Sequence, residues 1–169
     1  APTLRRGTGY EGWLSSYVEQ LVEQCPPDDA DLIVAGHPLD AVTDAKLFER
    51  YPNLHVVPHT TTIDLLELVD CVISDYSTIA LSAGLLGKPV LHFVPDIETY
   101  RVSPGLNVDV LEDERIVASA NAQEIMRAAL DCEMRNRAQE GYWAFTSEYF
   151  ANDCTNATRR IAAFVADLL

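Results

Sequence analysis

Short runs of β-branched and other apolar residues alternate with longer amphipathic runs along most of this chain. This order constrains the fold more than any other feature, because strands that alternate with helices form parallel sheets with helical crossovers. The run at residues 71–74 reads Cys-Val-Ile-Ser, and its apolar character is typical of a strand buried on both faces. We therefore expect an α/β fold with a Rossmann-like, open, doubly wound parallel sheet.

The expected elements follow from hydrophobic periodicity and from turn residues. Strands are predicted at residues 31–36, 54–57, 71–74, 89–94 and 116–118. Helices are predicted at roughly residues 10–24, 42–51, 62–69, 77–86, 122–133, 135–150 and 154–168, with a loop-rich stretch at 95–113. At 169 residues the chain has the length of one domain. We expect an α/β core over about residues 1–120 and a helical tail over about 121–169.

The acidic composition limits the classes of ligand. Lysine and arginine together number 12 and aspartate and glutamate 26, which gives a formal net charge of −14. A chain of this charge repels nucleic acid and anionic membrane as a whole, so a bound phosphate requires a local positive field. We expect no nucleic-acid partner, and we expect any phosphate to be held at one defined site.

The cysteines and the apolar runs predict the compartment. The 4 cysteines lie far apart and form no CxxC pair, which indicates a reducing environment and no metal site. No apolar stretch reaches the roughly 18 residues of a membrane span, and the N-terminal residues lack the order of a signal peptide. These features predict a cytoplasmic location.

The turn at residues 75–78, which reads Asp-Tyr-Ser-Thr, is the first candidate site. It joins a predicted strand directly to a predicted helix, at the edge of the sheet where ligands of open α/β folds bind. Free N–H groups and the helix dipole favour an anion there, and the hydroxyls of Ser77 and Thr78 add donors. The turn therefore predicts phosphate binding; the alternative is that Ser77 only caps its helix.

Two other strand ends carry polar residues. Gly36 permits close approach to a ligand and Pro38 directs the chain away, which leaves His37 at the sheet edge as a donor to a phosphate or leaving group. The alternative is a structural histidine. His59, Thr60 and Thr61 follow the next strand, where they either contact a base or ribose or only cap a helix.

Charged residues that could help lie in two further stretches. Asp96 and Glu98 would accept hydrogen bonds from sugar hydroxyls, and Arg101 would offset phosphate charge, unless these residues form an ordinary solvated loop. Arg5 and Arg6 form the only strongly basic stretch with flanking glycines, so they are candidates for the local positive field or simply solvated terminal residues.

The order of these motifs resembles the CDP-glycerol glycerophosphotransferase family, the teichoic-acid polymerases and primases. The resemblance rests on Ala-Pro-Thr-Leu-Arg at 1–5, Gly-His-Pro at 36–38, Asp-Cys-Val-Ile-Ser-Asp-Tyr-Ser-Thr at 70–78, Gly-Lys-Pro-Val at 87–90 and Asp-Ile-Glu-Thr-Tyr-Arg at 96–101. It covers most of residues 1–101 and reaches residues 152–160 weakly. The specific part is the pair of motifs at 75–78 and 96–101.

The resemblance implies the C-terminal, nucleotide-binding half of a GT-B enzyme with two Rossmann-like domains. In that family the diphosphate of the CDP-alditol lies against the helix that Ser77 and Thr78 open here. From their charge, we expect Arg5 or Arg101 to assist. The histidine matching His37 takes part in catalysis. CDP-glycerol or a similar CDP-alditol is then the expected substrate. From the residues themselves we expect no cofactor or metal, and we expect the turn from His59 to Thr61, together with Asp96, to meet the nucleotide or alditol.

The same resemblance implies partners outside this sequence. The acceptor is a lipid-linked or polysaccharide hydroxyl, and the acceptor groove belongs to a missing N-terminal domain, so the segment alone is expected to be inactive. The full-length enzyme is expected on the inner face of the cell membrane as a peripheral protein. Arg101 is followed by Val-Ser-Pro-Gly where the family often has Arg-Gly, which leaves the transferred alditol open.

Two other functions remain compatible with the sequence. A nucleotide-sugar-dependent GT-B glycosyltransferase, or a relative of UDP-N-acetylglucosamine 2-epimerase, shares the fold and a serine-bearing turn. A non-catalytic, flavodoxin-like interaction module would place Asp75 at a strand end, but the acidic pair that a receiver has after its first strand is absent.

Overall fold

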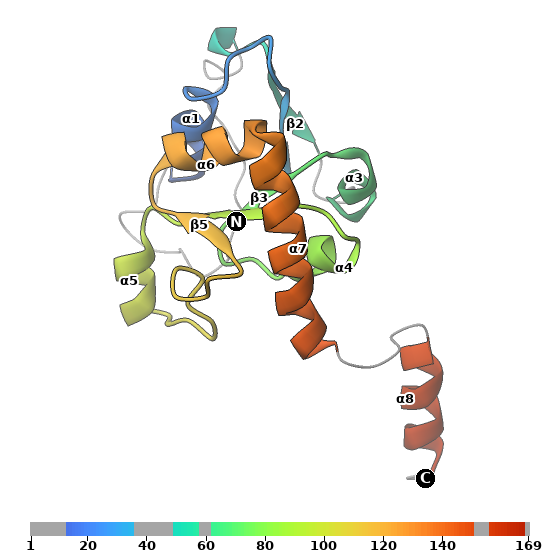
Figure 1. Cartoon of the computed structure of the whole chain (residues 1–169). Coiled ribbons are helices and arrows are strands. Elements are labelled where there is room, and N and C mark those ends of the chain that lie inside the picture. The colour runs from blue at the N-terminus through green and yellow to red at the C-terminus, as the bar shows by residue number, and fades with distance from the viewer. Residues whose placement is uncertain (1–12, 36–48, 58–61, 151–155, 168–169) are drawn as a thin grey trace.

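The computed structural model describes residues 13–35, 49–57, 62–150 and 156–167. The helices are α1 (Trp13–Val22), α3 (Thr62–Leu68), α4 (Ile79–Leu85), α5 (Ile97–Val102), α6 (Ala122–Leu130), α7 (Cys132–Tyr149) and α8 (Ala157–Ala166). The strands are β1 (Leu32–Ala35), β2 (Leu54–Val57), β3 (Val72–Ser74), β4 (Val90–Phe93) and β5 (Val117–Ser119). Strands and helices therefore alternate through most of the described chain, as expected (Figure 1).

Every strand pairing among the described residues is parallel. Strands β1 and β2 form one hydrogen-bonded pair, and β3, β4 and β5 form a second sheet in that order. A cavity of about 760 Å³ lies between the facing edges of β1 and β3. The parallel α/β fold is confirmed, but the sheet is divided into two hydrogen-bonded parts. Periodicity predicts the strands, and their alternation with helices predicts their parallel direction. The distance between neighbouring strands depends instead on packing.

Strand β4 is covered on both faces, which explains why its sequence is apolar apart from His92. Leu91 and Phe93 belong to a core formed with α1 and α6. Val90 and the following Val94 belong to a second core, formed with α4 and α7. All four side chains are fully buried. Because successive residues of a strand point to opposite faces, the same strand organises both cores.

The observed elements differ most clearly from the expected ones at two places. A helix was expected to run to residue 133, but α6 ends at Leu130 and α7 begins at Cys132. Asp131 separates them, because its carboxylate accepts a hydrogen bond from the Met134 N–H at 2.8 Å and so caps α7. The loop expected at residues 95–113 contains α5, whose Ile97 and Tyr100 are buried one helical turn apart. The helix expected at 42–51 lies largely outside the described residues.

Helix α7 is packed closely against α4. A Cβ atom at Gly84 would lie 2.7 Å from Tyr142 Cδ1 and 2.8 Å from Thr146 Cγ2. A Cβ atom at Gly141 would lie only 2.1 Å from the Arg115 carbonyl oxygen. These two glycines permit the close approach that seats α7 over the sheet.

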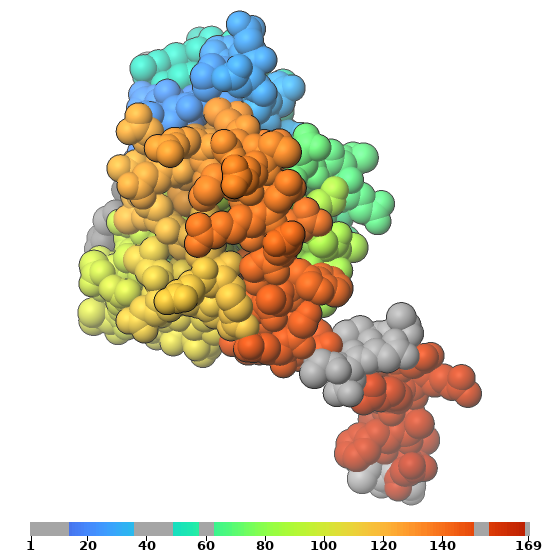
Figure 2. Space-filling model, in the orientation of Figure 1, coloured from blue at the N-terminus to red at the C-terminus, as the bar shows by residue number. Residues whose placement is uncertain are grey.

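Helix α8 lies apart from the rest of the described molecule (Figures 1 and 2). It contains no buried residue. Among the described residues, no helix combines the length and apolar character that crossing a membrane requires.

Candidate functional site

The 75–78 turn lies at the carboxyl end of β3 and leads into α4, as predicted. Asp75 is buried, and its carboxylate accepts a hydrogen bond from the Ser77 N–H at 3.0 Å. The Ser77 hydroxyl accepts only a long bond, 3.5 Å, from the Ile79 N–H. Thr78 occupies the cap position with an exposed side chain that makes no capping bond. The buried carboxylate therefore shapes the turn, and helix capping does not account for the Thr78 hydroxyl.

The turn forms part of the wall of the cavity between β1 and β3. Ser74, Asp75 and Ser77 line this cavity of about 760 Å³, together with β1 as far as Ala35. Ligands of open α/β sheets bind beyond the carboxyl ends of the strands. The polar end of this cavity thus lies where the fold class predicts a ligand.

The second motif, at residues 96–101, contacts the turn through aromatic side chains. The Tyr76 hydroxyl donates to Asp96 Oδ1 at 3.2 Å. The rings of Tyr76 and Tyr100 stack, with their centroids 3.8 Å apart and their planes at 22°. Sequence reasoning did not predict this tyrosine pair, although both tyrosines are part of the motifs that carried the resemblance. Asp96, predicted to contact sugar hydroxyls, lies beside the turn and binds Tyr76.

Arg101 is held by two carboxylates. Its Nε donates to Asp109 Oδ2 at 2.6 Å and its Nη1 to Glu98 Oε1 at 2.5 Å. The hydrogen bond from Arg101 holds the pKa of the Asp109 carboxyl below its usual value. The Arg101 side chain, predicted to offset phosphate charge, is one-third exposed and pairs with Asp109 and Glu98.

His92, in the middle of β4, lies beneath the turn. Its Nδ1 lies 2.5 Å from the Asp75 carbonyl oxygen and its Nε2 lies 3.1 Å from the Tyr142 hydroxyl. Burial lowers the pKa of the imidazole. A histidine at the middle of an apolar strand was the signal in the sequence, but neither partner could be inferred from it.

Several predicted site residues lie outside the described part of the chain. These are Arg5, His37, His59, Thr60 and Thr61. Their predicted roles remain predictions.

The described residues contain no cluster of three or more histidine, cysteine, aspartate or glutamate side chains able to hold a metal ion. Burial raises the pKa of the Cys71 thiol to about 12, so this cysteine stays protonated and unreactive near neutral pH.

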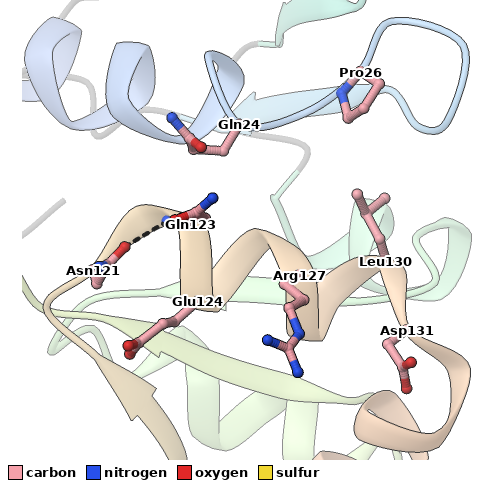
Figure 3. Close-up of a pocket in the computed structure, with 8 residues that line it drawn as sticks. All are labelled: Gln24, Pro26, Asn121, Gln123, Glu124, Arg127, Leu130 and Asp131. Atoms are coloured by element: carbon pink, nitrogen blue, oxygen red, sulfur yellow. Dashed lines mark hydrogen bonds between the residues drawn. The ribbon is translucent and has the colours of Figure 1, made fainter.

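A second hollow, of about 700 Å³, lies between the C-terminal end of α1 and helix α6 (Figure 3). Its polar side chains include Gln24, Asn121 and Arg127. The Asn121 side-chain oxygen Oδ1 accepts from the Gln123 N–H at 2.9 Å and so caps α6. None of the predicted site residues that the structure describes lines this hollow, and the 75–78 turn remains the candidate site.

Comparison with known proteins places this geometry in context. The family model for CDP-Glycerol:Poly(glycerophosphate) glycerophosphotransferase matches residues 1–167. The chain is also similar to the teichoic acid glycerol-phosphate primase of Bacillus spizizenii, with 31% identity over 106 residues. That match covers 63% of this chain and 27% of the primase, so the chain spans about a quarter of that relative's length.

Solved structures of the wall teichoic acid polymerase TagF resemble this chain in fold. A TagF variant soaked with CDPG for 30 minutes superposes with a TM-score of 0.63 at 20% identity, over 91% of this chain and 38% of TagF. Another TagF structure gives a TM-score of 0.54 at 16% identity, over 94% of this chain and 48% of that one. The Rossmann-like α/β fold expected from the sequence is therefore confirmed.

Proposed function

This chain belongs to the CDP-glycerol:poly(glycerophosphate) glycerophosphotransferase family, and we propose that it is the donor-binding part of an enzyme of teichoic-acid synthesis. The enzyme would transfer an alditol phosphate, glycerol phosphate in the first instance, from a CDP-activated donor to a hydroxyl of a lipid-linked or polysaccharide acceptor. The observation that carries the proposal is the 75–78 turn, which lines the cavity at the carboxyl end of β3 and contacts the second motif through Tyr76.

The turn would hold the donor diphosphate. The hydroxyls of Ser77 and Thr78 lie at the start of α4, and the Thr78 hydroxyl makes no capping bond there. Preorganised donors aimed at phosphate oxygens stabilise their charge. Ser77 lines the cavity, and the exposed Thr78 follows it at the start of α4. Asp75 supports this role indirectly, because its carboxylate accepts from the Ser77 N–H and so shapes the loop.

Other residues would complete the site. His37 would stabilise charge on the CMP leaving group, and Arg5 or Arg101 would assist at the diphosphate. Arg101 is bonded to both Glu98 and Asp109 in this structure. To bind phosphate, it would have to release at least one of these carboxylates. His59 and the two threonines after it would meet the nucleotide, with Asp96 near the alditol. The scheme routes no step through a metal or cofactor.

The acceptor side would come from elsewhere in the enzyme. An N-terminal domain would supply the acceptor groove and the base that activates the acceptor hydroxyl, so this chain alone would bind the donor without turnover. We propose that the full-length enzyme works as a peripheral protein on the inner face of the cell membrane, where a lipid-linked acceptor is available.

Calorimetric titration tests the proposal directly. We expect CDP and CDP-glycerol to bind more tightly than UDP-N-acetylglucosamine, with CDP-ribitol as the probe of alditol choice. The double variant Ser77→Ala with Thr78→Val should weaken CDP binding by about tenfold or more, because hydrogen bonds to charged groups contribute about 1.5–3 kcal/mol each.

A matched control is Ser147→Ala. Ser147 lies on α7, and its hydroxyl donates to the Trp143 carbonyl oxygen at 2.7 Å, away from the turn. It should leave CDP affinity unchanged. Unaltered affinity in the double variant, or tighter binding of the UDP-sugar than of CDP-glycerol, would contradict the proposal.

A further inference from the structure

His92 stands at the point where the sheet ends and the 75–78 turn begins. It is 2% exposed, and it pairs with Ser74, the last residue of β3, in the β3–β4 register. The main-chain ladder between these strands therefore ends at Ser74. One residue farther along, the Asp75 carbonyl oxygen lies 2.5 Å from His92 Nδ1. The His92 side chain on β4 therefore holds the backbone of the turn one residue beyond the last strand-paired residue.

The chemistry of the two partners sets the direction of the hydrogen bonds. A carbonyl oxygen only accepts, so the proton of the imidazole is on Nδ1. In the neutral ring Nε2 is then an acceptor, and the Tyr142 hydroxyl donates a hydrogen bond to it at 3.1 Å. The relay runs from Tyr142 on α7, through His92 on β4, to the backbone of the turn. Burial supports it, because it lowers the pKa of His92 and raises that of Tyr142, which favours both neutral forms.

We propose that His92 is a positioning residue of the donor site, one that fixes the Asp75 peptide and thereby the placement of Ser77 and Thr78. A binding group must be held within about 0.5 Å of its productive position by neighbours that are themselves fixed. Tyr142 meets this need, since its ring packs against Gly84 and stacks near His92 with centroids 5.5 Å apart. That the site binds a CDP-activated donor rests on the proposed function. That His92 fixes the Asp75 peptide does not depend on it.

Three substitutions of His92 distinguish the effect of its hydrogen bond to Asp75 from the effect of its side-chain volume. His92→Phe keeps an aromatic ring and removes the donor to Asp75. His92→Asn places an amide near the position of Nδ1, and His92→Gln places one near Nε2. We expect CDP affinity to fall by about tenfold in the Phe and Gln variants and to be largely restored in the Asn variant.

A second measurement needs no nucleotide. The Ser77 amide is bonded to the Asp75 carboxylate within the turn, so its hydrogen exchange reports whether the turn is held. Exchange at Ser77 should be about tenfold faster in the Phe and Gln variants than in the wild type and the Asn variant. The ¹⁵N signals of the wild-type imidazole should show a protonated Nδ1 and an unprotonated Nε2.

Two further variants provide an independent test of the hydrogen bonds and a control for stability. Tyr142→Phe leaves His92 in place and removes its orienting hydroxyl, so it should give a smaller change in the same direction even if a His92 variant folds poorly. Val22→Ala truncates a residue in the core on the opposite face of β4, so it should lower the melting temperature without changing Ser77 exchange or CDP affinity.

The outcomes distinguish this inference from the proposed function. If CDP binds and His92→Phe leaves both affinity and Ser77 exchange at wild-type values, the positioning role is wrong and the donor site stands. If no nucleotide binds but Ser77 exchange follows the Phe, Gln and Asn series, the proposed function fails and the hold on the turn stands. A wild-type imidazole protonated on Nε2 overturns the inference in either case.

Discussion

Individual side chains in this chain gain their properties from two kinds of surroundings, burial and opposite charge. His92 is an example of the first, since desolvation lowers the pKa of its imidazole against the opposing influence of Asp75. Asp109 is an example of the second, since the hydrogen bond from Arg101 lowers its pKa. The two groups therefore affect stability in different ranges of pH.

The pH dependence of unfolding should reveal the buried histidine. Because the pKa of His92 is lower in the folded than in the unfolded protein, the unfolded state takes up a proton first as the pH falls below about 6.5. The free energy of unfolding should then decrease with falling pH, by at most about 1.4 kcal/mol per pH unit, until the folded-state pKa is passed. Asp109, with an ordinary value near 3.8, contributes only at lower pH.

Urea titrations between pH 5 and pH 8 measure this dependence. The Asp75 carbonyl oxygen and the Tyr142 hydroxyl contact the His92 ring, and both titratable residues remain in the His92→Phe variant. The variant should therefore show a flatter profile below about pH 6.5. An equally steep profile in both proteins would assign the dependence to other groups.

Among the elements, α4 and α7 depend most closely on each other. The Gly84 position faces Tyr142 and Thr146 side chains, whereas the Gly141 position faces the Arg115 backbone. Side chains adjust by rotation, but a backbone carbonyl held in a loop has less freedom. Adding a methyl group should therefore cost more free energy at Gly141 than at Gly84.

Alanine substitutions test that order. Gly84→Ala should lower the free energy of unfolding by about 1–3 kcal/mol through overpacking, and Gly141→Ala should lower it by more. Ser82→Ala, on α4 and only half-buried, should change it by less than about 0.5 kcal/mol. Chemical denaturation of the three variants measures the series, and a stabilised Gly84→Ala protein would show that α4 and α7 lie farther apart than described.

At the scale of the whole molecule, the described residues up to Phe150 form a body with two hydrophobic cores, and helix α8 lies apart from it. The two buried clusters share β4 and draw residues from α1, α4, α6 and α7. Helix α8 contributes none, and its Ile161, Phe164 and Val165 are exposed. The stability of the body should therefore be independent of α8.

Truncation tests this independence. A chain ending at Phe150 should keep its melting temperature within about 2 °C of the complete chain, because it loses no buried contact of the described residues. A chain ending at Ala138 should not fold, since it lacks Tyr142 and Phe145 of the second core. A drop of many degrees in the first truncation would mean that α8 packs on the body in solution.

The identity and order of most elements could be predicted from the sequence. Strands such as Val90–Phe93 follow from short apolar runs, and helices such as Ala122–Leu130 follow from helical periodicity; both patterns depend on neighbouring residues alone. Helix α5 was missed because its short buried face, Ile97 and Tyr100, lies among charged residues. The division of the sheet was missed because it depends on packing between β1 and β3.

The same distinction applies to the candidate site. The sequence alone pointed to the 75–78 turn, because a strand followed directly by hydroxyl residues and a helix is a local pattern. Only the tertiary structure brought Tyr100 onto Tyr76, turned Arg101 toward Asp109, and placed His92 between Asp75 and Tyr142. These contacts join residues as far as 50 positions apart, and such pairs are selected by the packing of whole elements, which no local pattern contains.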